Sequence, residues 1–287
     1  MTEAKDATPA DADSALRDSL EGKTVAELFA LTLEGDFYDD APWEAISTLR
    51  HRGTPEFFEE AFQMAMEFCR SDDPLKRARA INVLGQLGCT AENSEGIHPE
   101  ERLAIALKHL SDEADIVVEA AAWALAHMRG EEAVKALLSV RQSSNEDVRH
   151  AVALGLLGET SPEAVEALIE LMQDVDDDVR DYATWSLGCE PVTGDPPVDS
   201  PQIREAFRGR LTDSFEDVRN EALWGLAIRK DPEGLRMLSE RLEADEWKAG
   251  DEGAAEYLLG LPYDTDISEL RDGLRRLLAE IEQDDAS

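Results

Sequence analysis

Residues 178–188, DVRDYATWSLG, decide the fold of this chain, because two close copies of this stretch occur elsewhere in it. Residues 147–157 read DVRHAVALGLL, and residues 217–227 read DVRNEALWGLA. With the Arg taken as position zero, Ala or Val stands at plus three and Leu at plus seven in every copy. Apolar residues at this spacing share one face of an α-helix. Each copy therefore predicts an amphipathic helix, called a signature helix below.

Four weaker copies extend the pattern along the chain. Their zero positions are Pro42, Arg77, Val118 and Glu252, and the full set of zero positions adds Arg149, Arg180 and Arg219. A repeated unit of this length is the mark of stacked helical units, each of which adds one supersecondary motif. The sequence therefore predicts an all-α fold, a solenoid of about seven helix pairs. Such an array is usually a binding surface and seldom a catalyst.

Proline residues mark the second helix of several units. Five amphipathic segments begin with Thr54-Pro55, His98-Pro99, Ser161-Pro162, Ser200-Pro201 and Asp231-Pro232. Proline suits the first helical position because the N–H that it lacks would be unpaired there. In four of the five pairs, the preceding residue has a side-chain oxygen that can cap the helix. We expect each of these prolines to begin a helix that pairs with a signature helix.

Composition and periodicity divide the chain into three parts. Residues 1–20 are rich in Ala, Asp, Ser and Thr without periodicity, which predicts a disordered acidic tail. The repeat array is expected over residues 21–263, starting at Thr24, which has capping-box spacing to Glu27. Residues 264–287 are predicted to hold a helix that caps the array, followed by a tail. Segments 88–99 and 188–201 are rich in turn-forming residues and are expected to be surface loops.

The chain is strongly acidic. Its 64 Asp and Glu against 28 Lys and Arg give a net charge of −36. This charge repels phosphate backbones, which excludes nucleic acid as a partner and favours basic proteins or peptides. An acid-rich, lysine-poor composition also suits a cytoplasm rich in salt, so salt adaptation is an alternative explanation of the charge.

Cysteine usage and hydropathy indicate the compartment. The three cysteines are widely spaced and form no CxxC pair, which favours a reducing environment. No apolar run approaches the roughly 18 residues of a membrane span. The acidic N-terminus is unlike a secretory signal peptide. We therefore expect a cytoplasmic protein without a membrane partner.

The repeated Asp and Arg, with Ala at plus three, Leu at plus seven and Gly at plus eight, resemble the HEAT-repeat superfamily. The closest resemblance is to the phycobilin-lyase type of HEAT-like repeat, over roughly residues 24–260. This resemblance implies a right-handed α-α superhelix with the signature helices on its concave side. It also implies that the motif Asp and Arg form hydrogen bonds between neighbouring units. The residues that carry this structural role would be Arg77, Asp147, Arg149, Asp178, Arg180, Asp217 and Arg219.

Catalytic motifs are missing from the sequence. It contains no HExxH, phosphate loop, dinucleotide fingerprint or GxSxG. Deoxyhypusine hydroxylases in the HEAT superfamily hold iron through His-Glu pairs, but none of the five histidines here is followed by Glu. We therefore expect no enzymatic activity, no metal and no cofactor.

Aromatic side chains recur at one helical position. Plus five lies about 200° from plus three, on the side of a signature helix that points away from the core. Trp123, Trp185 and Trp224 occupy it, and Tyr257 follows in the last unit. The helical positions plus two and plus nine lie beside plus five. The predicted partner-binding residues are Trp123, His127, Tyr182, Trp185, Glu221, Trp224 and Tyr257. The alternative is that these aromatic residues pack between adjacent signature helices.

The pattern predicts a non-enzymatic scaffold or adaptor. Aromatic anchors in a concave groove would bind a protein or peptide, and an acidic rim would select partners that are basic or that expose apolar side chains. The alternative function is a lyase-like accessory protein that binds a small aromatic or tetrapyrrole ligand in the same groove.

Overall fold

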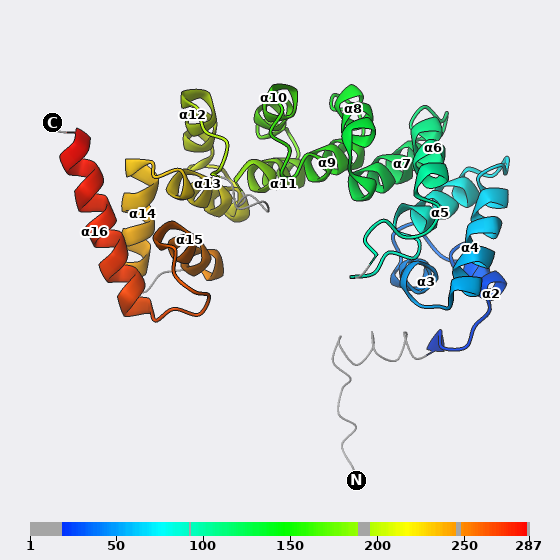
Figure 1. Cartoon of the computed structure of the whole chain (residues 1–287). Helices are drawn as coiled ribbons and strands as arrows, with labels where there is room; N and C mark the ends of the chain where they lie inside the picture. The colour runs from blue at the N-terminus through cyan, green and yellow to red at the C-terminus, as the bar shows by residue number, and fades with distance from the viewer. Residues whose placement is uncertain (1–18, 92, 189–195, 245–247, 286–287) are drawn as a thin grey trace, which may run out of the picture. The chain divides into compact units, whose positions relative to one another are not determined.

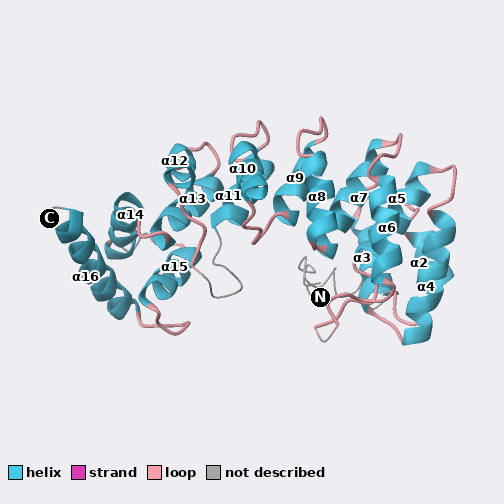
Figure 2. Cartoon of the chain, turned by 45° about the horizontal axis from the view of Figure 1, so that its top comes forward, coloured by secondary structure: helices cyan, strands magenta, loops and turns pink. Residues whose placement is uncertain are grey.

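The computed structural model describes residues 19–285, apart from 92, 189–195 and 245–247. In this part of the chain every regular element is an α-helix and no strand occurs (Figure 2). The predicted all-α fold is confirmed. All but the last two residues of the predicted N-terminal tail lie outside the described residues, and Leu20 is buried. The chain divides into two compact units, Met1–Val140 and Arg141–Ser287, which are called unit 1 and unit 2.

Unit 1 alternates signature helices with their partners (Figure 1). Its helices are α2 (Val25–Leu31), α3 (Asp40–His51), α4 (Pro55–Phe68), α5 (Pro74–Gly85), α6 (Pro99–His109), α7 (Asp115–Met128) and α8 (Glu131–Ser139). The signature helices α3, α5 and α7 pack one against the next. Helices α2, α4 and α6 each pack on the signature helix that follows them.

Unit 2 repeats this arrangement. Its helices are α9 (Glu146–Gly155), α10 (Pro162–Leu171), α11 (Asp177–Gly188), α12 (Pro201–Arg210), α13 (Glu216–Ile228), α14 (Pro232–Glu243), α15 (Ala249–Leu259) and α16 (Ile267–Asp285). The signature helices α9, α11, α13 and α15 again pack in succession. Helix α16 begins where the C-terminal helix was predicted and packs on α14 and α15. Leu270 and Leu274 of α16 are buried in the core that these helices share.

The predicted proline starts are confirmed. Pro55, Pro99, Pro162, Pro201 and Pro232 each begin a helix. Side-chain oxygens of Thr54, Ser161, Ser200 and Asp231 accept backbone N–H bonds at those helix starts. His98 forms no such bond and instead stacks on Phe62 with 4.1 Å between the ring centroids. The capping box of Thr24 and Glu27 is also present.

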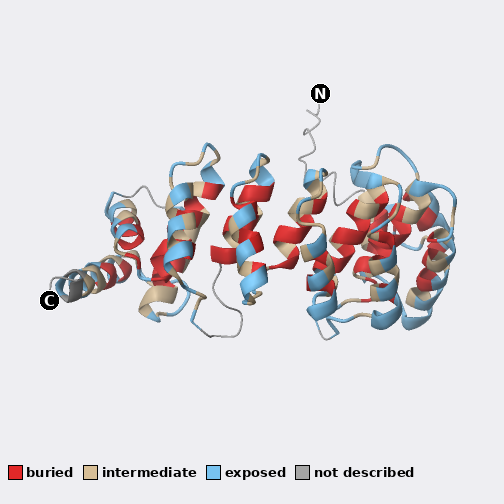
Figure 3. Ribbon diagram, turned by 90° about the horizontal axis from the view of Figure 1, so that it is seen from above, coloured by how far each residue is buried: buried red, intermediate tan, exposed pale blue. Residues whose placement is uncertain are grey.

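The helical register follows the sequence pattern. Side chains at plus three and plus seven are buried, with Leu259 of the last signature helix half-buried as the exception. Figure 3 shows the buried residues concentrated where the helices of each unit face one another. Of the first predicted loop, residues 88–91 and 93–98 lie outside helices. Of the second, residues 196–200 also lie outside helices, and 189–195 fall outside the described residues.

Arginines of the signature helices join neighbouring repeats. In unit 2, Nε and Nη2 of Arg180 donate to the carboxylate of Asp213 at 3.0 and 2.9 Å. Arg149 pairs in the same way with Asp174, at 2.7 and 2.8 Å. The backbone carbonyl of Asp174 also accepts from Arg180, and that of Asp213 accepts from Arg219. These bonds form a continuous ladder from α9 to α13.

The carboxylate held across each repeat boundary comes from the turn before the next signature helix. Unit 1 has the same arrangement, because Arg77 forms a bidentate pair with Asp112 at 3.0 and 2.7 Å. The carboxylates that bind these arginines across the repeats are those of Asp112, Asp174 and Asp213. The implied role of the motif aspartates Asp147, Asp178 and Asp217 stays a prediction. The turn aspartates fit this role because each also caps the following turn, accepting from the backbone N–H two residues ahead.

We expect Leu187→Ala to destabilise the fold by about 2–5 kcal/mol, because Leu187 is buried at plus seven and truncation leaves a cavity. Leu154→Ala is the matched control, since Leu154 is half-buried at plus five. Urea titrations followed by circular dichroism would measure both. Equal stability of Leu187→Ala and the parent protein would contradict the register.

We expect Asp213→Asn to cost about 3 kcal/mol at pH 7, because it breaks a nearly buried ion pair with Arg180. Burial raises the pKa of Asp213, but the hydrogen bonds from Arg180 and the backbone N–H of Phe215, together with the charges of Arg180 and Arg210, outweigh burial and hold that pKa below its usual value. A carboxyl with a depressed pKa stabilises the fold above its unfolded pKa, and this contribution is lost on acidification. The difference in the free energy of unfolding between Asp213→Asn and the parent protein should therefore shrink below about pH 4.

Asp178→Asn, at an exposed motif aspartate on α11, is the control for this pair and should cost less than about 1 kcal/mol. Urea titrations at pH 7 and pH 3 would compare the three proteins. A larger cost for Asp178→Asn than for Asp213→Asn would contradict the assignment of the ladder.

Candidate functional site

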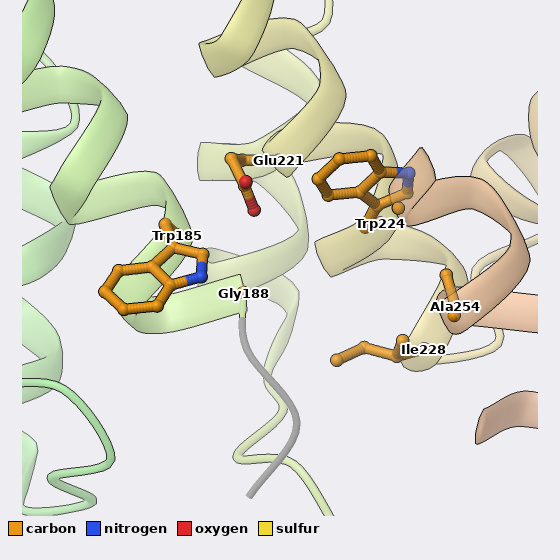
Figure 4. Close-up of a pocket in the computed structure, with 8 residues that line it drawn as sticks. Trp185, Gly188, Glu221, Trp224, Ile228 and Ala254 are labelled. Atoms are coloured by element: carbon orange, nitrogen blue, oxygen red, sulfur yellow. The ribbon is translucent and has the colours of Figure 1, made fainter. Parts of the chain in front are cut away.

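Unit 2 contains a pocket between two of the predicted tryptophans. Trp185 on α11, and Glu221 and Trp224 on α13, border a volume of about 360 Å³. The remaining lining residues are Gly188, Ile228, Gly250, Gly253 and Ala254. Figure 4 shows the Glu221 side chain between the two indole groups. The structure thus brings together three residues that the sequence predicted, and it adds a wall from α15 that the sequence did not predict.

Trp224 is a fixed wall of this pocket. Its indole Nε1 donates to Oδ1 of Asp251 at 2.6 Å, and the Asp251 side chain is fully buried. Asp251 also accepts from the backbone N–H of Lys248 at 2.8 Å. A Cβ added at Gly250 would lie 2.2 Å from the Trp224 ring. Glycine at this position therefore allows α15 to lie directly against the indole.

Trp185 belongs to an aromatic cluster. Its ring meets Tyr182 edge-on, with 5.9 Å between centroids, and Tyr182 meets His150 of α9 at 4.0 Å. Trp185 and Trp224 are both half-buried. Trp224 packs against α15 and also borders the pocket, whereas Trp185 contacts Tyr182 of its own helix and borders the pocket.

Carboxyl groups gather beside the tryptophans. Burial raises the pKa of Glu221 to about 8, and the charges of Asp181 and Asp217 add to this shift. Burial likewise raises the pKa of Asp181 to about 6, with Asp217 and Asp178 adding to it. Oδ1 of Asp181 is buried without a hydrogen-bond partner. These carboxyl groups oppose one another's ionisation, and a nearby cation would relieve that repulsion.

The other predicted binding residues lie elsewhere. Tyr257 is half-buried on α15 and packs against the core of unit 2 instead of lining this pocket. Trp123 and His127 belong to α7 of unit 1, where their rings lie 6.4 Å apart. The pocket in unit 2 therefore uses Trp185, Glu221 and Trp224, with Tyr182 packed behind Trp185.

In unit 1, part of the equivalent face is covered by the chain itself. The guanidinium of the fully buried Arg79, at plus two of α5, lies 4.4 Å from the Phe37 ring centroid. The neighbouring Tyr38 hydroxyl donates to the carboxylate of Glu119 on α7 at 3.2 Å. Sequence reasoning missed this contact, although Arg79 occupies the same position as Glu221.

Neither a metal site nor a membrane-spanning helix occurs in the described residues. No group of three His, Cys, Asp or Glu side chains there is arranged to hold a metal ion. No helix in the same residues has the length and apolar character needed to cross a membrane.

Comparisons with known proteins agree with the repeat pattern. Residues 100–188 match the family model of HEAT repeats. The repeat pattern of these residues is therefore that of HEAT repeats. No curated protein sequence matches it significantly. The resemblance to the phycobilin-lyase type of HEAT-like repeat stays a prediction.

Solved structures show that the chain has the fold of α-helical repeat solenoids. YibA of Escherichia coli matches with a TM-score of 0.67 and 22% identity, over 96% of this chain and 100% of YibA. An engineered protein matches with a TM-score of 0.52 and 21% identity, over 94% of this chain and 71% of its own. Kap95p in complex with RanGDP matches with a TM-score of 0.56 and 16% identity. That match covers 96% of this chain and 37% of Kap95p.

The raised pKa of Glu221 predicts how the stability of the protein responds to pH. Glu221 stays protonated in the folded state up to about pH 8, whereas an unfolded Glu ionises near pH 4.3. The folded state therefore binds more protons between these values, and stability falls as pH rises through this window. We expect Glu221→Gln to match the parent protein at pH 4 and to be more stable at pH 9.

Urea titrations at pH 4, 7 and 9 would measure this effect, with Glu240→Gln on the exposed side of α14 as the control. A constant stability difference between Glu221→Gln and the parent protein across these pH values would contradict the burial of Glu221.

Proposed function

We propose that this HEAT-repeat protein is a non-enzymatic scaffold or adaptor that binds a basic segment of a partner protein. The proposed site is the face of unit 2 formed by Trp185, Glu221 and Trp224. The observation that carries the proposal is the pocket itself, in which two indoles flank a carboxyl group whose neighbours are also acidic.

Charge supports a basic partner. A cation in the pocket would lie beside Glu221 and near Asp181, and it would reduce the repulsion that raises the pKa of both groups. The net charge of −36 would also speed the encounter with a positively charged segment. Trp residues in partly enclosed positions often carry much of the binding energy at protein interfaces.

The fold supports a binding role. Stacked helix pairs present extended surfaces, and repeat solenoids use these surfaces for recognition. Kap95p, which shares the fold, binds RanGDP in one structure and Nup1 in another. The fold hosts several functions, so the proposal rests on the pocket and its charge.

We expect Trp185→Ala to weaken partner binding by at least about tenfold while changing stability little, because Trp185 borders the pocket. Trp224→Ala should weaken binding and also lower stability, since it removes the hydrogen bond to Asp251. Pull-down and mass spectrometry would identify a partner. Fluorescence anisotropy with a labelled basic peptide would then compare the variants.

Tyr263→Ala is the matched control, because Tyr263 is 85% exposed and lies outside the pocket. Unchanged binding by Trp185→Ala would contradict the proposed site. A coloured or fluorescent ligand that copurifies with the parent protein and is lost from Trp185→Ala would favour the alternative, an accessory protein for a small aromatic or tetrapyrrole ligand.

A further inference from the structure

We propose that the pocket between Trp185 and Trp224 is a cage for a methylated ammonium group, carried on a trimethyllysine side chain of the partner. This inference rests on the proposed function and adds the chemical class of the side chain that enters the pocket.

Aromatic walls and one carboxylate are the elements of such a site. Trp185 of α11 and Trp224 of α13 border the pocket, and Glu221 lies between them (Figure 4). A cation near an indole is attracted by the negative face of the ring, and Trp gives the strongest attraction of this kind. Trp224 is held in place by Asp251 and by the close approach of α15 at Gly250, so this wall is preorganised.

The electrostatic environment favours a positive charge. Asp181 and Asp217 lie close enough to Glu221 to disfavour its ionisation. The ligand for this pocket is therefore a cation.

Hydrogen-bonding capacity favours a methylated cation over an ordinary Lys or Arg. Among the lining residues, Glu221 supplies the carboxylate acceptor, and the others are Trp, Gly, Ile and Ala. An unmodified ammonium brings three N–H donors and a guanidinium brings five. Donors left unpaired in an apolar pocket cost binding free energy. Trimethylation removes every donor from the ammonium and keeps its charge, so the apolar walls accept it at the lowest cost.

The size of the pocket is compatible with this group. Its volume of about 360 Å³ lies at the lower end of the roughly 300–1,000 Å³ of small-ligand pockets. A Cβ added at Gly253 would meet no atom within 4 Å. The glycine surface of α15 thus leaves room beside the indoles for the stem of the incoming side chain.

The test compares four short peptides that differ at one side chain. The peptide is acetyl-Gly-Ser-Xaa-Ser-Gly-amide, with Xaa as Lys, trimethyllysine, Arg or the neutral neohexyl analogue of trimethyllysine. Isothermal titration of the full chain at pH 9, where Glu221 is mostly ionised, measures each affinity. We expect trimethyllysine to bind at least about tenfold more tightly than Lys, Arg and the neutral analogue, since the cation and its methyl groups are both recognised.

Three variants locate the binding. Trp185→Ala should lower the affinity for the trimethyllysine peptide about tenfold, Trp185→Phe should lower it less, and Glu221→Gln should lower it by removing the carboxylate. Tyr263→Ala should leave it unchanged. Circular dichroism checks that each variant is folded, and Trp185→Phe keeps the test valid if Trp185→Ala unfolds.

The outcomes separate the two proposals. Equal affinity for Lys, Arg and trimethyllysine peptides, with loss in Trp185→Ala, would overturn the methylated-ammonium inference and leave the basic-segment proposal standing. If the neutral analogue binds as tightly as the trimethyllysine peptide, the pocket recognises shape without charge. That result would overturn both the methylated-ammonium inference and the basic-segment proposal. Peptide binding that is insensitive to Trp185 and Glu221 would also overturn both.

Discussion

The bidentate pair between an arginine of one repeat and an aspartate of the next is the constraint on which the rest of unit 2 depends. Arg180 holds the carboxylate of Asp213 and the carbonyl of Asp174, and Arg149 holds the carboxylate of Asp174. A planar guanidinium that satisfies two acceptors at fixed angles sets both spacing and rotation between helices. Because these groups are largely buried, a shifted register would leave charges unpaired, which is costly.

This fixed register places side chains of neighbouring signature helices side by side. Trp185 and Trp224 stand at the same position of α11 and α13, so one pocket receives both indoles. In unit 1 part of the equivalent face is already covered, because Phe37 lies over Arg79 and Tyr38 binds Glu119. In unit 2, Glu221 occupies the position of Arg79 and borders an open pocket, so the same helical framework serves two different purposes.

The carboxyl groups beside the pocket differ from the carboxylates on the surface. Salt adaptation concerns carboxylates in contact with solvent, but Asp181 and Glu221 are half-buried and their pKa values are raised to about 6 and about 8. Such carboxyl groups oppose stability at neutral and higher pH, and shifts of this kind gather at functional sites. Adaptation of the surface to salt gives no reason for acids in these positions, whereas binding of a cation does.

The sequence by itself determined the helices and their buried faces. Proline at Pro162 and Pro201 predicted helix starts, and plus three and plus seven predicted the core, because helical periodicity and capping act within a few residues of the chain. Only the tertiary structure decided that Arg180 pairs with Asp213, and that Asp251 and Gly250 fix Trp224. These contacts depend on the translation and rotation between successive repeats, which no local spacing encodes.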